Sequence, residues 1–137
     1  MTRIFWLGNL LPLPFWLLMI LLPNWRWTHR VMASPLVVSP LAVVYVALMA
    51  PRLGRVAPAI RNPTLPSVAA LLATPDGATL AWLHMMMGDL FVGRWVYLDA
   101  RDRALDPRVT SPVLALAMIF SPAAFLLHLA LRSRLAE

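Results

Sequence analysis

The sequence predicts an all-α integral membrane protein: a four-helix bundle with proline-kinked spans and a short interfacial helix between the second and third spans. Hydrophobic residues make up 61% of the chain, above the roughly 45–50% typical of soluble domains. They gather in long apolar runs separated by arginine-rich loops. So little polar surface cannot cover a soluble globule, and the length of 137 residues fits one transmembrane domain, residues 1–137.

The first predicted span covers residues 4–22. At about 1.5 Å per residue it extends about 28 Å, close to the roughly 30 Å hydrocarbon core of a bilayer. It is longer than the apolar part of a secretory signal, and no small-x-small cleavage site follows it. Pro12 and Pro14 remove backbone donors and are expected to kink the helix, either as an ordinary bend or as part of a cavity wall.

The second predicted span covers residues 31–50. The connection that follows is rich in Pro and Arg and contains an apolar stretch, 65–73, that is too short to cross a bilayer. We therefore expect a short interfacial helix there. Asp76, in a Pro-Asp-Gly turn sequence, is placed to cap the next helix.

The third predicted span covers residues 78–98 and the fourth covers 111–131, with Pro122 near the middle of the fourth. The loop between these spans carries charges of both signs and is expected to face water. Four spans place both termini on the same side of the membrane.

Arginine counts predict the orientation of the spans. The side with both termini holds six arginines and the other side five, so the positive-inside rule places both termini in the cytoplasm. Every basic residue is Arg, and the chain opens directly on a span without a plastid transit sequence. We therefore expect a multi-pass protein of a bacterial inner membrane.

Three polar residues lie inside the third span: His84, Asp89 and Arg94. An ionisable side chain near the bilayer centre costs roughly 2.5–3.5 kcal/mol on insertion scales. Pairing, a water-filled cavity or a chemical reaction would each compensate that cost. A spacing of five residues turns a helix by about 140°, so Asp89 does not stack directly on either neighbour.

The fourth span offers a partner for these groups. If it runs antiparallel to the third, His128 lies at the depth of His84, with Asp89 about a turn and a half below. Such a set could handle protons or bind a metal. A metal is disfavoured because two His and one Asp form a minimal set without tight motif spacing, and we expect no metal and no cofactor.

Structural roles remain open for the same residues. His84 could bond a carbonyl freed by a proline, and Asp89 could form an ion pair with Arg94 that fixes helix packing. The Met85-Met86-Met87 run could be ordinary packing or a pocket wall. Gly88 and Gly93 favour close approach of another helix.

Two absences exclude several classes of chemistry. Without Cys the chain forms neither disulfides nor thiolate metal sites, and without Lys it forms no retinal or pyridoxal Schiff base. No basic stripe with interleaved aromatic residues is present, so we expect no nucleic-acid partner.

The polar set belongs to a longer pattern. It reads Trp82-x-His84-x4-Asp89-Leu90-Phe91-x2-Arg94-x4-Asp99. This pattern resembles the signature of the abscisic-acid-deficient-four-like membrane proteins, whose plant members are implicated in making neoxanthin from violaxanthin. The resemblance extends over nearly the whole chain through Trp6-Leu7-Gly8, Leu13-Pro14-Phe15-Trp16, Ser34-Pro35, Tyr45-Val46, Pro122 and His128.

The resemblance implies carotenoid or related isoprenoid chemistry within the lipid bilayer. It implies an isomerase that opens an epoxide and removes a proton to leave an allene, without net oxidation or reduction. Asp89 and His84 would form the acid–base pair, Arg94 would tune Asp89, and His128 would assist. The expected substrate-binding residues are Trp82, Met85, Gly88, Phe91 and Trp95.

Two other functions remain open. A non-catalytic carotenoid-binding protein, or a small structural subunit of a membrane complex, would use the same polar residues to fix helix packing. A transporter or channel is less favoured because the short chain has no internal repeat. Partners beyond the bilayer and an isoprenoid would be a second copy of the chain or another membrane subunit.

Overall fold

The computed structural model describes residues 1–134, and this part of the chain is helical with no strand, which confirms the all-α prediction. Its elements are α1 (Thr2–Leu10), α2 (Leu13–Leu21), α3 (Arg26–Ala33), η1 (Pro35–Val38), α4 (Ser39–Met49), η2 (Ala50–Arg52), α5 (Leu53–Arg61), α6 (Leu65–Leu72), α7 (Pro75–Asp102) and α8 (Pro107–Arg134), where η denotes a 3₁₀-helix.

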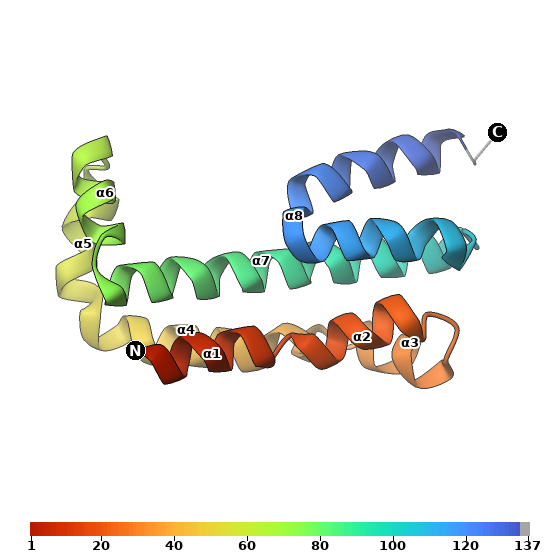
Figure 1. Cartoon of the computed structure of the whole chain (residues 1–137), viewed down its shortest axis with the longest axis horizontal. Helices are drawn as coiled ribbons and strands as arrows, with labels where there is room; N and C mark the ends of the chain where they lie inside the picture. The colour runs from red at the N-terminus through yellow and green to blue at the C-terminus, as the bar shows by residue number, and fades with distance from the viewer. Residues whose placement is uncertain (135–137) are drawn as a thin grey trace.

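Helix α7 runs through the centre of the molecule (Figure 1). Its 28 residues give a length of about 42 Å at 1.5 Å per residue. Helices α1, α2 and α4 lie along one side of α7, and the first half of α8 lies beside α7 and contacts α2 as well. Thr74 caps the start of α7 by accepting a hydrogen bond from the Gly77 amide, and Asp76 lies in the first turn.

Counted along the chain, three helical stretches have the length and apolar composition of a membrane span: Thr2–Leu21, Pro35–Arg61 and Pro107–Arg134. The second bends where α5 begins and the third turns at Phe120. These segments make the chain a helical membrane protein. Helix α7 is as long as α8 but is not among them, because its polar residues lower its hydropathy. Length and composition therefore support three membrane-crossing segments among residues 1–134, whereas four were predicted.

Helix α8 does not form the single kinked span predicted over 111–131. Phe120 has a non-helical backbone, with φ −149° and ψ 74°, and Pro122 beyond it has no amide hydrogen to continue the helix. The second half of α8 turns back over the first half (Figure 1). Each half, at about 20 Å, is shorter than the roughly 30 Å hydrocarbon core, so α8 is a helical hairpin.

The second predicted span begins later than expected. Val31 still belongs to α3, and the chain becomes extended at Ser34, the residue before Pro35. A proline disfavours helical backbone in the residue that precedes it, which explains the break. The Ser34 hydroxyl then accepts a hydrogen bond from the Leu36 amide and caps η1.

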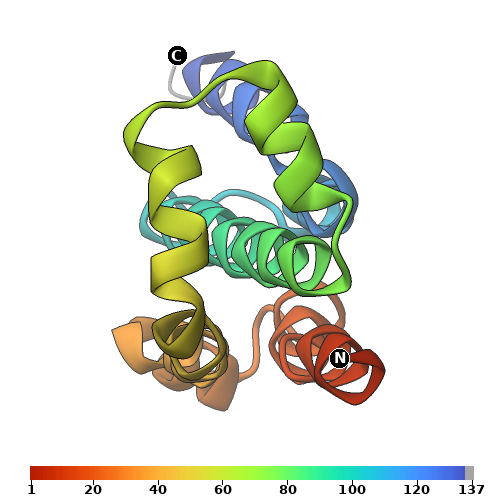
Figure 2. The same ribbon diagram turned by 90° about the vertical axis from the view of Figure 1, so that its left-hand side faces the viewer.

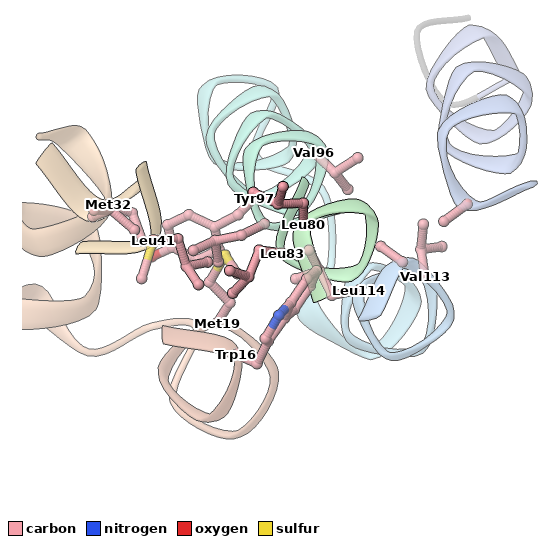
Figure 3. Packing of buried hydrophobic residues seen from close by; sticks show 14 of the residues in the cluster. Trp16, Met19, Met32, Leu41, Leu80, Leu83, Val96, Tyr97, Val113 and Leu114 are labelled. Atoms are coloured by element: carbon pink, nitrogen blue, oxygen red, sulfur yellow. The ribbon is translucent and has the colours of Figure 1, made fainter. Parts of the chain in front are cut away.

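The hydrophobic core surrounds α7. Trp16 and Met19 from α2, Leu83 and Leu90 from α7, and Leu114 from α8 are almost fully buried, and Figure 3 shows the cluster between these helices. In this packing α2, α7 and the first half of α8 contact one another directly.

Helices α5 and α6 stand across the end of α7, at a steep angle to it (Figure 2). A helix does form in the stretch predicted to be interfacial, and the Thr64 and Ser67 side chains cap it reciprocally. The N-terminus lies at this end of the molecule, whereas Arg134 lies at the opposite end (Figure 1). The two ends of the described chain therefore do not share one side as predicted, because α8 doubles back.

Candidate functional site

Asp89 is the polar residue at the middle of α7. Its Oδ1 accepts a hydrogen bond of 2.5 Å from the Ser121 hydroxyl, which the turn in α8 brings to this level. Ser121 is buried and Asp89 is half-buried. Because the chain turns at Phe120, the Ser121 hydroxyl lies beside Asp89, which is the carboxylate in the central part of α7.

An apolar groove of about 280 Å³ opens beside Asp89. At its edge Trp82 Nε1 donates a hydrogen bond of 3.1 Å to Asn9 Oδ1, and Asn9 Nδ2 donates one of 2.8 Å to the Phe5 carbonyl of α1. The groove is lined by Asn9, Pro12, Leu13, Trp16, Trp82, Met86, Asp89, Met118 and Ile119. An acid–base group with apolar walls can exchange a proton while most water is excluded.

His84 does not join Asp89. It is exposed on another face of α7, where its ring lies 5.7 Å from the ring of Tyr45 in α4. It lines a second groove, between α4, α5, α6 and the beginning of α7. The expected acid–base pair of His84 and Asp89 is not assembled in this structure.

Arg94 bonds to the backbone of α3. Its Nε donates to the Met32 carbonyl at 2.7 Å, and its Nη2 donates to the Ala33 carbonyl at 3.0 Å. These carbonyls belong to the last turn of α3 and have no partner within that helix. The ion pair between Asp89 and Arg94 that the sequence allowed is absent from the described residues, and Arg94 instead ties α7 to α3.

His128 lies beside Asp99 near the end of α7. Its Nε2 is 2.8 Å from Asp99 Oδ2, and Arg132 donates to Asp99 Oδ1 at 3.1 Å. Since Asp99 is 15 residues beyond His84, the two histidines are about 22 Å apart along α7. The prediction that they share one depth is wrong, because the second half of α8 runs parallel to α7 instead of antiparallel.

Asp99 is the centre of a charged cluster that the sequence analysis missed. Besides His128 and Arg132 it accepts hydrogen bonds of 3.1 Å from Arg103, and the Trp95 ring packs against both His128 and Arg132. The sequence analysis assigned Asp99 to a water-facing loop, although Asp99 is the last residue of the motif that begins at Trp82. Because residues four apart face each other on a helix, the pair Asp99 and Arg103 could have indicated that the third helix continues past residue 98.

Ser121 and Asn9 were also missed. Both are polar residues inside apolar runs, which is the signal that identified Asp89. An uncharged polar side chain costs less free energy to insert into a membrane than a charged one, so its presence in an apolar run is weaker evidence of a functional site. Their pairing with Asp89 and Trp82 depends on helix packing.

The expected substrate-binding residues lie in three places. Trp82 lies at the Asp89 groove, whereas Met85, Gly88 and Phe91 are exposed along another face of α7. Trp95 packs against Phe125 of α8, with ring centroids 5.3 Å apart. Of the five, the structure brings Trp82 alone to Asp89. Among residues 1–134, no three His, Cys, Asp or Glu side chains converge as a metal site would require.

These features define a helical membrane protein whose central helix presents a hydrogen-bonded carboxylate to an apolar groove. Residues 3–128 match the model of the ABA DEFICIENT 4-like family, and the chain belongs to this family, as its motif predicted. It is similar to Protein ABA DEFICIENT 4, chloroplastic, of Arabidopsis thaliana, with 26% identity over 133 residues. That match covers 93% of this chain but 59% of the plant protein. No solved structure matches the chain.

Proposed function

We propose that this chain is a membrane-embedded isomerase of carotenoids or related isoprenoids, with Asp89 as its acid–base group. The observation that supports this most is the Asp89 carboxylate, bonded to Ser121 and open to an apolar groove. Membership in the ABA DEFICIENT 4-like family supports the substrate class. The groove is at the small end of ligand sites and fits one end ring of a long polyene.

The proposed reaction is a redox-neutral rearrangement of an epoxide to an allenic alcohol. The protonated carboxyl group donates its proton to the epoxide oxygen as the carbon–oxygen bond breaks. The carboxylate then removes a proton from the polyene carbon, which leaves the allene and restores the acid. The proton count balances, so the cycle consumes neither oxidant nor reductant.

The remaining residues take supporting roles in this proposal. Ser121 orients the Asp89 carboxylate, and Trp82 forms a wall for the ring. Arg94 and His128 are positioning residues, because they attach α7 to α3 and α8 to α7. The exposed face with Met85, Gly88 and Phe91 would hold the polyene chain, and His84 would contribute only as a proton carrier from its separate groove.

The test is to express the protein in a bacterial host that produces epoxy-carotenoids and to separate the total and co-purifying pigments by chromatography. We expect a new isomeric carotenoid with the native chain, none with Asp89→Asn, and less with Ser121→Ala. Asp102→Asn, an exposed carboxylate at the end of α7, is the control and should keep the product. Product formation that survives Asp89→Asn would contradict the proposed role.

A carotenoid-binding or structural module is the second candidate. It is favoured by the use of Arg94 and His128 in contacts between helices rather than at the groove. A carotenoid that co-purifies unchanged, with no new isomer in the cells, would favour this function.

A further inference from the structure

Two adjoining hollows, of about 550 and 380 Å³, lie between α5, α6 and the beginning of α7. Val56, Leu71, Gly77 and Leu80 line both hollows and pack between them, and the larger hollow opens beside Arg52 and Arg55. The larger hollow, which we call the α5–α6 groove, is on a different face of α7 from Asp89.

The α5–α6 groove has a polar end and apolar walls. Arg52, Arg55 and Asp76 line the polar end, whereas Pro58, Ala59, Ala70 and Leu80 form apolar walls. Such an arrangement matches an amphiphile with a charged head and a hydrocarbon tail.

The polar end carries a net positive charge. Arg52 Nε donates to Asp76 Oδ2 at 2.6 Å, and Arg52 Nη1 donates to the Leu48 carbonyl at 2.8 Å, so this guanidinium is held in place. Arg55 forms no hydrogen bond or ion pair with the described residues 1–134. One arginine charge is therefore available for an anion.

The position of this end fits the surface of a bilayer. Helices α5 and α6 stand across the end of the helices that run along α7 (Figure 2), so they lie along the membrane plane when those helices cross it. Leu65 at the start of α6 is 84% exposed, as expected for a helix facing lipid. The groove therefore lies at the level of the headgroups, beside the first turns of α7.

We propose that the α5–α6 groove binds an anionic phospholipid. The lipid phosphate would pair with Arg55 beside the fixed Arg52 guanidinium, and the start of one acyl chain would lie against the apolar walls formed by Ala59, Ala70 and Leu80. Arginine forms charge-assisted hydrogen bonds with the phosphate of an anionic headgroup, whichever leaflet contains the lipid. The site is independent of the proposed isomerase reaction and stands whether or not Asp89 is catalytic.

The first test measures lipid selectivity of the full chain. The protein is purified in mild detergent and titrated with phosphatidylglycerol or phosphatidylcholine of identical acyl chains, and bound lipid is counted by native mass spectrometry. We expect preferential retention of phosphatidylglycerol, with binding weakened about fivefold by Arg55→Gln. Arg61→Gln, on α5 but outside the groove, is the matched control and should bind as the native chain does. Equal binding of the two lipids, or equal losses in the two variants, would overturn the proposal.

The second test blocks the groove and keeps every charge. Ala70 lines the groove and the neighbouring Ala69 does not, although both are exposed on α6. We expect Ala70→Trp to displace phosphatidylglycerol and Ala69→Trp to leave it bound, with both variants keeping the native thermal unfolding midpoint. Excess inorganic phosphate should fail to displace the lipid. Displacement by phosphate alone would indicate a simple anion site and overturn the assignment to a lipid.

Discussion

Gly88 and Gly93 lie five residues apart on α7, yet an added side chain would meet different surroundings at each position. A Cβ atom at Gly93 would overlap the buried Trp16 ring, whereas a Cβ atom at Gly88 would meet no atom within 4 Å. Both glycines were predicted to allow close approach of another helix. In the structure only Gly93 is covered by another helix, α2, through Trp16. The spacing of glycines in the sequence identifies a face of α7 but does not reveal whether another helix packs on that face.

We therefore expect Gly93→Ala to lower the free energy of unfolding by about 1–3 kcal/mol, since the rigid indole cannot yield without repacking. Gly88→Ala should be neutral or slightly stabilising, because alanine loses less backbone entropy in a helix. Thermal unfolding in detergent, followed by circular dichroism, measures both. Equal midpoints for the two variants would contradict the close packing of Trp16 on α7.

Asp99 stabilises the end of the hairpin by bonding to His128, Arg132 and Arg103 at once. We expect Asp99→Asn to lower the unfolding free energy by about 1–2 kcal/mol, a value reduced because both arginines are partly exposed. Asp102→Asn, at an exposed position on the same helix end, should have little effect. The comparison is made by thermal unfolding at one pH, and an unchanged midpoint for Asp99→Asn would show that the cluster adds no stability.

At the scale of the elements, the turn at Phe120 makes α8 a hairpin instead of the single span predicted from the sequence. In a straight α8, antiparallel to α7, residue 134 would lie near the beginning of α7. In the hairpin it lies near the end of α7, where Arg132 contacts Asp99. Proline composition predicted a bend at this point, but the direction and size of the bend depend on one backbone conformation.

Spin labels can distinguish the two shapes of α8, because the native chain has no cysteine. With Arg134→Cys we expect a short distance to a label at Asp102→Cys and a distance of more than about 30 Å to one at Ala78→Cys, since 24 residues of helix separate the two α7 positions. Pulsed electron paramagnetic resonance gives both distances. The reverse order would establish a straight α8.

The hairpin also changes the orientation expected for the whole molecule. The end that holds Arg134 carries seven arginines: Arg26, Arg30, Arg101, Arg103, Arg108, Arg132 and Arg134. The end that holds the N-terminus carries four: Arg3, Arg52, Arg55 and Arg61. The positive-inside rule then predicts a cytoplasmic C-terminal end and an N-terminus on the opposite side.

An impermeant thiol reagent applied to intact cells tests this orientation. We expect labelling of Thr2→Cys and protection of Arg134→Cys, with labelling of both after the membrane is opened. The reversed pattern would show the opposite orientation. Equal labelling of both positions in intact cells would contradict the placement of the termini at opposite ends.

The helical class, the apolar segments, the family and the exceptional polar residues of α7 could all be predicted from the sequence. These properties depend on hydropathy and residue spacing, which are local along the chain. Tertiary structure alone decided which polar groups meet: Asp89 with Ser121, Arg94 with α3, and His128 with Asp99. The first and third pairs form because one non-helical residue, Phe120, reverses the second half of α8 and brings Ser121 and His128 to α7. Arg94 meets α3 because α3 packs against α7.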